Sequence, residues 1–529
     1  WALDPDTLPT GGRITSGQGA ITQTGTQMTV SQQTDRLIAN WSTFDIGRDA
    51  AVAFRQPGAS SVALNRITGQ DPSRIFGSLS ANGQVFLLNP SGIIFGQSAR
   101  VDVGGLVASS LSLSDEDFLS GTYTFTNAGN AGAIINQGTI RTADGGAVAF
   151  LSPVVANEGS ITAAGGTVAL AAGNKISLDF TGDGLVSFSV EQGAIDAMAE
   201  NRGLIRADGG AVLMTAKAAD TLTQSVVNNA GIIEATGMLT SGGRIILDAD
   251  GGRTTISGTL DASSDSARGG RVIATGERVL VLSGAHLDAS GATGGGEILV
   301  GGAWQGGDPS IRQATATVIE AGATLEANAT VAGNGGTVVA WSDIANPASV
   351  TRAYGAFEAK GGVNGGDGGR IETSGHWLDV GSAPDISAPQ GNGGLWLIDP
   401  YNITVVAGGG NSNINAASPF ESTGNTASLG ITLIDTALSG GDVIIRTGAG
   451  GTQAGDITWN TAYTYAGAAA RSLTLEAHRD ILLNQNIASS NGASLWYSMS
   501  VATPPLYGQY FRKRKKCRGS NEIFGARPN

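Results

Sequence analysis

A unit of about 20 residues repeats along the chain, and this repeat limits the possible folds more than any other feature. Each unit has an Asn-x-Gly-x-Ile segment and then a Gly-Gly pair followed by small and β-branched apolar residues. Clear copies occupy residues 136–150, 157–170, 201–213 and 229–247. Ile140 and Ile161 occupy equivalent positions 21 residues apart. A chain built from such copies is expected to stack them as an array.

The unit itself predicts a parallel β-helix. A short strand cannot bury a face alone, but coils stacked on copies of themselves enclose a continuous core. The Gly-Gly pairs supply corners with positive φ. Each Asn can bond to the Asn of the next coil or close a turn with its own backbone. A leucine-rich repeat would need several Leu in every unit. We therefore expect an all-β chain that forms a right-handed parallel β-helix (β-solenoid) with a capped N-terminal end.

Changes in the repeat divide the chain into four expected parts. These are a first domain at residues 1–245, a Gly-rich array at 246–400, further solenoid repeats at 401–493, and a non-repetitive basic tail at 494–529. Trp396, Tyr401 and an Asp-Pro turn interrupt the array, after which short strands resume, beginning at residues 430–433. The acidic cluster at residues 112–117 predicts a turn or the start of a short helix.

Composition supports an ordered chain that does not bind nucleic acid. Glycine accounts for 81 of 529 residues, and 41% of residues are hydrophobic against 14% charged, whereas a disordered chain would be richer in charge. The formal net charge is −13, and phosphate binding needs clustered Lys and Arg. No stretch has the roughly 20 mostly apolar residues of a transmembrane helix. Cys517 is the only cysteine, so disulfides cannot stabilise the body of the chain.

Residues 81–96 (ANGQVFLLNPSGIIFG) contain a strand–turn–strand corner. Two short runs of strand-forming apolar residues, 85–88 and 93–95, flank Asn89-Pro90-Ser91-Gly92. Proline at the second turn position presets φ, and glycine at the fourth ends the turn, which is a type I turn signature. The corner is therefore expected to join two buried strands.

Four segments, in this order, resemble the haemagglutination-activity domain that opens filamentous-haemagglutinin-like proteins of the two-partner secretion type. They are LPTGG at 8–12, ANWSTFDIG at 39–47, SVALNRITGQDPSRIFGSL at 61–79 and ANGQVFLLNPSGIIFG at 81–96. The resemblance is greatest for the branch of high-molecular-weight adhesins, and it extends over residues 1–245. GGLWLIDPYNITV at 393–405 is also similar to the arrays of large adhesins in this family.

The resemblance implies a secretion motif at one turn. The family's Asn-Pro-Asn-Gly-Ile pattern falls on Asn89, Pro90, Ser91, Gly92 and Ile93. Serine replaces the third-position asparagine of the pattern. Both side chains can bond the local backbone, so the turn is expected to survive.

The resemblance also implies a partner and a destination. A two-partner-type β-barrel transporter in the outer membrane of a Gram-negative cell would recognise the N-terminal domain, and the chain would pass through the periplasm to become secreted or cell-surface-bound. The expected function is that of a secreted surface adhesin with a protein or glycan receptor. One alternative is the carrier or stalk of a contact-dependent toxin or haemolysin. Another is a polysaccharide-acting β-helix enzyme, which would need a carboxylate or basic cluster on one face of consecutive coils.

Trp41, Phe44 and Ile46 form an aromatic and aliphatic stripe in the second family segment. They could face the transporter. They could equally be core residues under an N-terminal cap, because a β-helix needs its open end covered to avoid edge-to-edge association. Both roles are compatible with a position near the recognition region.

Enzymatic chemistry is not expected. His286, His376 and His478 are far apart in the sequence and are expected at the surface or in turns. No nucleotide-binding, zinc-protease or serine-hydrolase motif is present. Asp248 and Asp250 would share a face if they lie in a strand, but flanking a turn at Gly-Gly is the commoner role. We therefore expect no catalytic, cofactor-binding or metal-binding residues.

The two ends of the sequence carry separate expectations. The chain begins with Trp1 rather than Met, so a signal peptide is expected to have been cleaved or to be missing. In the tail, Pro504-Pro505 breaks any strand, and six basic residues surround Cys517. This abrupt change suggests a frameshift or a broken gene near residue 494, against a basic anchor or a short separate domain. The tail is then expected to be disordered and the chain truncated.

Overall fold

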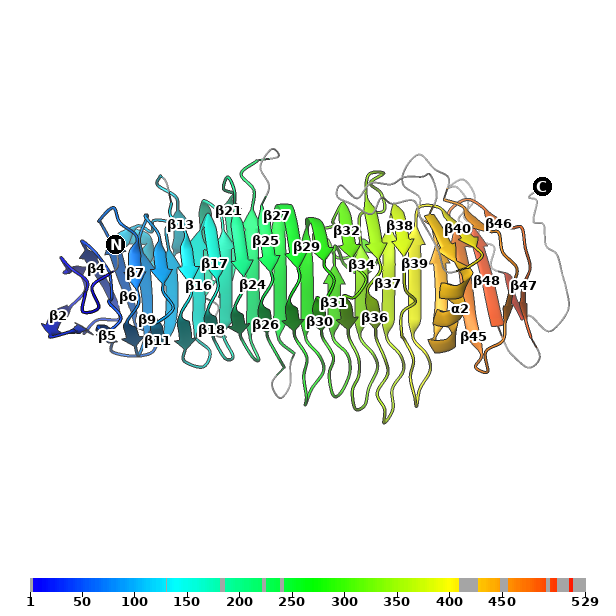
Figure 1. Cartoon of the computed structure of the whole chain (residues 1–529), viewed down its shortest axis with the longest axis horizontal. Coiled ribbons are helices and arrows are strands. Elements are labelled where there is room, and N and C mark those ends of the chain that lie inside the picture. Colours follow the sequence, from blue (N-terminus) through cyan, green and yellow to red (C-terminus); the bar gives the residue numbers. More distant parts are fainter. Residues whose placement is uncertain are drawn as a thin grey trace. The chain divides into compact units, whose positions relative to one another are not determined.

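The computed structural model describes residues 3–129, 131–180, 186–220, 225–237, 242–408, 427–447, 455–490, 495–501 and 513–516. The chain divides into two compact units, each considered by itself below. Unit 1 comprises Trp1–Met238 and Gly243–Asp261, and unit 2 comprises Leu239–Gly242 and Ala262–Asn529. Within each unit, strands from successive coils stack side by side as parallel ladders (Figure 1).

In unit 1 the sequence repeat corresponds to one coil of three strands. Strands β14 (Ile134–Asn136), β15 (Thr139–Thr142) and β16 (Ala147–Ser152) form one coil, and β17 (Val154–Asn157), β18 (Ser160–Thr162) and β19 (Thr167–Ala172) form the next. The two coils pair in parallel with Asn136 opposite Asn157 and Ile140 opposite Ile161. The expected all-β parallel β-helix is therefore confirmed.

The three strands of each coil contribute to three faces, which we call faces A, B and C. Face A of unit 1 contains β4 (Arg36–Trp41), β6 (Val62–Ile67), β9 (Gln84–Leu88), β12 (Gly105–Ser109), β16, β19, β24 (Ala211–Lys217) and the first half of β27 (Arg244–Ile256). Face B contains β7 (Ser73–Ile75), β10 (Ile93–Phe95), β14, β17, β22 (Met198–Asn201), β25 (Val226–Asn229) and the second half of β27. Face C contains β3 (Gln27–Gln32), β5 (Ala51–Arg55), β8 (Ser78–Ala81), β11 (Arg100–Val103), β15, β18, β23 (Leu204–Arg206), β26 (Ile232–Glu234) and β28 (Thr259–Asp261).

A ladder of four buried asparagines runs along unit 1 at the corner between faces B and C. The side-chain amide of Asn136 donates to Asn157, Asn157 donates to Asn201, and each N–O distance is 2.8 Å. Asn201 donates in the same way to Asn229 at 2.8 Å. The side-chain oxygen of Asn136 also accepts from the backbone N–H of Gly138. Both roles expected for these asparagines, the ladder and the local turn, are confirmed.

The glycine pairs act in two ways. In unit 1 the first glycine of three pairs has positive φ, as expected for a corner; these are Gly145 (76°), Gly165 (64°) and Gly209 (72°). In unit 2 the pairs at 295–296, 335–336, 368–369 and 393–394 have no positive φ, so the expectation does not extend to them. The pairs of both units allow close stacking, since a Cβ on Gly369 would overlap the carbonyl oxygen of Gly336 and a Cβ on Gly166 that of Gly146.

Antiparallel strands cap the N-terminal end of unit 1. Strand β1 (Arg13–Ser16) pairs antiparallel with β4, and β2 (Gly19–Thr24) pairs antiparallel with β3. They cover the first parallel coil, which would otherwise expose unpaired backbone groups. The expected cap is confirmed.

Part of face A in unit 1 is covered from outside. Helix α1 (Asp115–Ser120) begins at the N-cap Ser114, whose hydroxyl accepts from the N–H of Asp117 at 3.0 Å. This confirms the expected short helix start. An antiparallel sheet of β13 (Tyr123–Thr126), β20 (Lys175–Phe180) and β21 (Val186–Gln192) lies beside it. The cover buries an aromatic cluster centred on Phe86 and Phe118.

Unit 2 continues the same coil plan. Its face A contains the first half of β29 (Arg271–Val281), β31 (Glu297–Val300), β34 (Thr337–Trp341), β37 (Arg370–Gly375), β39 (Leu395–Pro400), β42 (Asp442–Arg446), β45 (Arg471–Ala477) and β48 (Leu495–Val501). Face B contains the second half of β29, β32 (Ala316–Ile319), β35 (Val350–Ala353) and β38 (Trp377–Val380). A separate parallel sheet contains β41 (Ala427–Gly430), β40 (Ile403–Val406), β43 (Ile457–Trp459) and β46 (Ile481–Leu483). Face C contains β30 (His286–Asp288), β33 (Thr324–Glu326) and β36 (Ala356–Glu358), and β44 (Tyr463–Tyr465) pairs with β47 (Ile487–Ser489).

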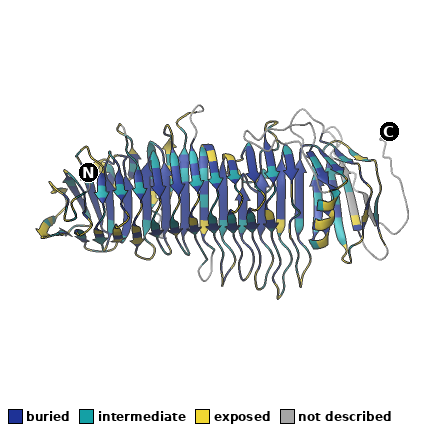
Figure 2. Ribbon diagram, in the orientation of Figure 1, coloured by how far each residue is buried: buried dark blue, intermediate teal, exposed yellow. Residues whose placement is uncertain are grey.

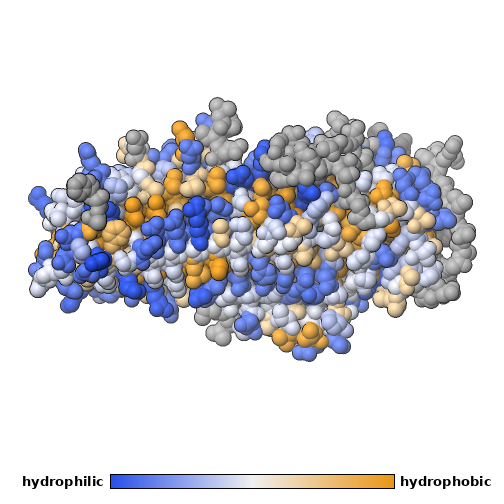
Figure 3. Space-filling view, in the orientation of Figure 1, coloured by the Kyte–Doolittle hydropathy of each residue, from blue (hydrophilic) through white to orange (hydrophobic). Residues whose placement is uncertain are grey.

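Burial follows the strand alternation in both units. Figure 2 shows the strands mainly in the buried colour and the connecting loops in the exposed one. Long loops connect faces C and A in unit 2, and hydrophobic residues gather at their tips (Figure 3). Val331 and Val363, exposed by 47% and 57%, lie on two such loops.

Two sequence expectations for unit 2 need correction. The strand expected at residues 430–433 is instead the start of helix α2 (Ile431–Gly440), because Ile434, Ala437 and Leu438 follow a helical spacing and are fully buried. The tail is not uniformly disordered, since β48 pairs in parallel with β45 and buries Leu495, and β49 (Lys513–Lys516) pairs with β48. Alternating apolar residues at the start of the tail extend face A. The other tail residues, with Pro504-Pro505 and Cys517, lie outside the described residues.

Candidate functional site

The corner between β9 and β10 forms the tight turn expected from the sequence. The N–H of Gly92 donates to the carbonyl of Asn89 at 2.9 Å, and the N–H of Ser91 donates to the Asn89 side-chain oxygen at 3.0 Å. Gly92 has a φ of 103°, which favours glycine. Asparagine thus closes the turn twice, once through its backbone and once through its side chain.

The turn is also bound to both neighbouring coils. The Asn89 amide donates to the carbonyl of Asp71 and to the hydroxyl of Ser73, both at 3.0 Å. On the other side, the N–H of Gly132 donates to the carbonyl of Pro90 at 2.7 Å. The Ser91 hydroxyl, expected to bond the local backbone, donates instead to Gln70 of the preceding coil at 2.7 Å. Because three coils meet here, losing the turn would disturb the stacking as well as the corner.

Most of the motif is hidden from solvent. Asn89, Gly92 and Ile93 are buried, Ser91 is half-buried, and Pro90 is exposed. A transporter that reads this corner directly would therefore touch Pro90 and Ser91. Asn89 would act by holding them in position.

Trp41, Phe44 and Ile46 lie in the core of the first coils, with at most 1% of each residue exposed. The two rings meet edge to face with centroids 5.3 Å apart. The indole N–H of Trp41 donates to Asn65 at 3.0 Å, and a Cβ on Gly12 would overlap the indole ring. This burial favours the cap-and-core interpretation over a stripe that faces a transporter.

Strand β7 brings the two groups of expected site residues together. Ile46 bridges to Ile75 on one side of this strand, and Ile93 pairs with Ser73 on the other. Between them lies an ion pair that the sequence did not reveal. Asp45 accepts from the backbone N–H of Arg74 at 2.7 Å and from its guanidinium at 3.1 Å. An Asp–Arg pair 29 residues apart has no local signal in the sequence.

A second arrangement missed by the sequence lies on face A of unit 2. Four charged residues from consecutive coils point outward at neighbouring positions; they are Glu372, Asp399, Arg446 and Glu476. The loop around the 3-10 helix η1 (Trp304–Gly306) contacts the first of them, since the N–H of Gln305 donates to Glu372 at 2.7 Å. Such a row is what a polysaccharide-acting β-helix enzyme would need. Glu372 and Asp399 are only 0% and 6% exposed, however, so they are not presented to a polymer.

Burial makes these two carboxyl groups weak acids. Removal from water raises the pKa of Glu372 to about 8, although hydrogen bonds from Gln305 and Ser374 oppose the shift. Burial likewise raises the pKa of Asp399 to about 7, against the attraction of Arg446. One oxygen of Asp399 is buried without a hydrogen-bond partner in the described part of the chain. Arg446 instead pairs with Glu476 at 2.7 Å.

We expect the stability of unit 2 to fall as the pH rises from about 5 to about 8. A carboxyl group whose pKa is raised by folding favours the folded state while it stays protonated, and this advantage is lost as the pH rises through the folded pKa. The free energy of unfolding should fall by up to roughly 1.4 kcal/mol per pH unit for each group. Glu372→Gln can still accept from the Gln305 N–H and can donate to the Ser374 hydroxyl in place of accepting from it, so it should flatten the slope without leaving either partner unpaired. Hydrogen exchange of unit 2 at several pH values measures this; a stability that rises with pH would contradict it.

The other candidate groups do not assemble into a site. His376 lies in the bend between β37 and β38, as one of the two expected positions, but it is not at the surface: it is 3% exposed and stacks on Tyr401 with ring centroids 4.5 Å apart. Asp250 lies within β27 and pairs with Lys217 at 3.7 Å. Across the described ranges, no group of three or more His, Cys, Asp or Glu residues could hold a metal ion. None of the helices in those ranges is long and apolar enough to span a membrane.

Comparisons with known proteins agree with the geometry of unit 1. Residues 6–262 match the model of the TPS (two-partner) secretion domain, and unit 1 ends at Asp261. Two heme/hemopexin-binding proteins of Haemophilus influenzae are 34% identical over 252 residues and 30% identical over 251 residues. The matches cover 46% and 43% of this chain but 27% and 26% of the relatives. The chain thus spans about a quarter of the length of the curated relatives it matches.

A solved structure supports the same assignment. The crystal structure of the HMW1 secretion domain from Haemophilus influenzae matches with a TM-score of 0.64 and 30% sequence identity, over 74% of this chain and 100% of that chain. A TPS secretion domain implies export across the outer membrane by a partner transporter. With its domain at residues 6–262, the chain belongs to the family of two-partner secretion exoproteins.

Proposed function

We propose that this chain belongs to a surface adhesin whose unit 1 is the export signal and whose unit 2 forms part of the stalk. An outer-membrane β-barrel transporter recognises unit 1 and passes the chain outward, where the coils fold. The secretion-domain match over residues 6–262 carries this proposal. The repeated coils of unit 2 support the stalk role.

The turn at Asn89 provides the test of export. Given a signal peptide and a matching transporter, Asn89→Ala should reduce the amount of chain in the medium several-fold, because the substitution removes three side-chain hydrogen bonds. Pro90→Ala should have a smaller effect, since only the preset φ is lost. Immunoblots of medium and periplasm measure the ratio of exported to retained chain.

Gln97→Ala is the matched control for this experiment. Gln97 is exposed in the turn after β10, so its loss should leave export unchanged. If the Asn89→Ala, Pro90→Ala double variant were exported at the wild-type level, the turn would have no part in export.

Attachment to surfaces separates the adhesin from the alternative of a toxin or haemolysin carrier. An adhesin predicts that cells displaying this chain bind epithelial cells or immobilised glycans more than cells that lack it. A carrier predicts equal attachment. The similarity to the heme/hemopexin-binding proteins covers about a quarter of their length, and its 252 and 251 residues are close in extent to the secretion-domain match at residues 6–262. It therefore supports shared export rather than a shared ligand.

A further inference from the structure

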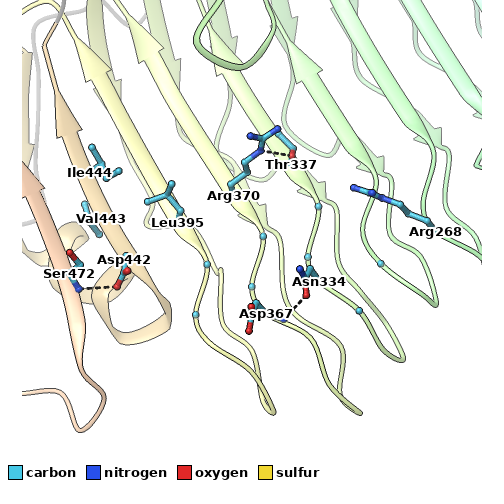
Figure 4. Close-up of a pocket in the computed structure, with 18 of the residues that line it drawn as sticks. Arg268, Asn334, Thr337, Asp367, Arg370, Leu395, Asp442, Val443, Ile444 and Ser472 are labelled. Atoms are coloured by element: carbon cyan, nitrogen blue, oxygen red, sulfur yellow. Dashed lines mark hydrogen bonds between the residues drawn. The ribbon is translucent and has the colours of Figure 1, made fainter. Parts of the chain in front are cut away.

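A groove of about 1050 Å³ runs across face A of unit 2 beside the long loops. Figure 4 shows Arg268 at one end and Ser472 at the other, with Asn334 and Asp367 on the loops between them. Strands β34, β37, β39, β42 and β45 each contribute lining residues. The groove therefore extends over successive coils, as a site for an elongated ligand would.

Glycine creates the floor of this groove. The pairs at residues 335–336, 368–369 and 393–394 line it in successive coils. Their tight stacking excludes side chains, since a Cβ on Gly394 would overlap the carbonyl oxygen of Gly369. The groove thus lies over these stacked glycine pairs, where no side chain fills the space.

Two arginines in the groove are held in place yet keep free donors. Arg268 donates through Nε to the carbonyl of Gly295 at 2.8 Å, and Arg370 donates through Nε to Thr337 at 2.9 Å. Arg370 also lies over the ring of Trp304, 4.5 Å from its centroid. Neither guanidinium has a carboxylate partner among the described residues. Their terminal nitrogens remain available to a ligand.

Two aspartates supply acceptors in the same groove. One oxygen of Asp367 accepts from the N–H of Asn392 at 2.7 Å, and one oxygen of Asp442 accepts from the N–H of Ser472 at 2.8 Å. Within the described ranges no hydrogen bond reaches the second oxygen of either carboxylate, so this oxygen is left for a ligand. Hydroxyl groups of Thr337 and Ser472 add donors and acceptors. The two arginines and two aspartates cancel, so the lining is formally neutral.

We propose that this groove binds an extended, neutral polysaccharide. Sugar hydroxyls both donate and accept, which matches a neutral lining that mixes free donors and acceptors. A polyanion would meet the repulsion of a chain with a net charge of −13. A peptide could not add as a strand, because the backbone of face A is already paired between coils. The inference rests on the proposed adhesin function and names a ligand class for it.

Binding by the purified full chain tests the proposal. Probes are dextrin and xyloglucan as neutral polysaccharides, heparin as a polyanion, and reduced carboxymethylated lactalbumin as an unfolded polypeptide. Affinity electrophoresis should show retardation by at least one neutral polysaccharide and none by heparin or the polypeptide. The double variant R268Q, R370Q should weaken that binding at least tenfold. R268Q alone should weaken it several-fold, and it serves as a second variant because Arg268 is exposed and makes one hydrogen bond.

Arg141→Gln, at an exposed position on face C of unit 1, is the matched control and should bind like the wild type. Absence of neutral-polysaccharide binding, preference for heparin or the polypeptide, or equal binding by R268Q and wild type would overturn the proposal. The assay involves no transporter and no host cell, so its failure leaves export and cell attachment as separate questions. The adhesin function would instead be contradicted if cells that display the wild-type chain attached no better than cells that lack it.

Discussion

Replacing Asn157 with alanine is expected to lower the free energy of unfolding of unit 1 by about 3–5 kcal/mol. Asn157 accepts from Asn136 and donates to Asn201, both at 2.8 Å, in a fully buried row. Alanine would leave the side-chain amide of Asn136 without its acceptor and the side-chain oxygen of Asn201 without its donor. Each buried group left unpaired costs about 1–3 kcal/mol. Hydrogen exchange by mass spectrometry measures the change in unit 1, with unit 2 as the internal reference.

Asn484→Ala is the matched control for this prediction. Asn484 donates to Asn460 at 2.6 Å in a similar cross-coil pair, but both residues are exposed. Water can replace that bond, so the loss should stay below about 0.5 kcal/mol. Equal effects of the two substitutions would show that burial is not the source of the ladder's stability.

Gly166→Ala is expected to destabilise unit 1 by about 3 kcal/mol or more. A Cβ on Gly166 would overlap the carbonyl oxygen of Gly146 in the preceding coil. That oxygen belongs to the backbone and cannot move without separating the two coils. The strain should spread to Gly210, which stacks on Gly166 from the other side. Urea unfolding followed by hydrogen exchange in unit 1 gives the loss.

The control is Gly58→Ala, in the same unit. No atom lies within 4 Å of a Cβ placed on Gly58, so alanine there should be neutral or slightly stabilising, since it reduces the freedom of the unfolded chain. A tolerated alanine at Gly166 would mean that the coils can separate locally, and the close-stacking role of the glycine pairs would be wrong.

The parts of the fold that the sequence predicts are those with a local signal. The Asn ladder follows from a repeat in which asparagine always precedes glycine by two residues, and the turn at Asn89 follows from residue preferences within four positions. The start of α1 follows from the acidic cluster at residues 112–117. Each of these needs only neighbouring residues or a constant period.

The parts that the sequence does not predict depend on residues brought together by coils of unequal length. Glu372 and Asp399 are 27 residues apart, while Arg446 is 47 residues beyond Asp399 because α2 and further chain intervene. Their alignment on face A is visible only once the strand register is known. The groove is not predicted for the same reason, because its lining residues come from several coils of unequal length. Helix α2 is not predicted because its buried residues, at helical spacing, lie within a single short segment surrounded by strands.

The Asn ladder has a direction, and this direction bears on how unit 1 assembles. Every amide in the row donates toward the C-terminal neighbour, from Asn136 to Asn229, so the aligned dipoles polarise one another. A coil that has just formed holds an unsatisfied donor until the following coil docks. Docking of one coil therefore makes docking of the next coil more favourable, as in a one-dimensional array with strong coupling between neighbouring repeats. Unit 1 should then melt as a single cooperative block rather than fray coil by coil.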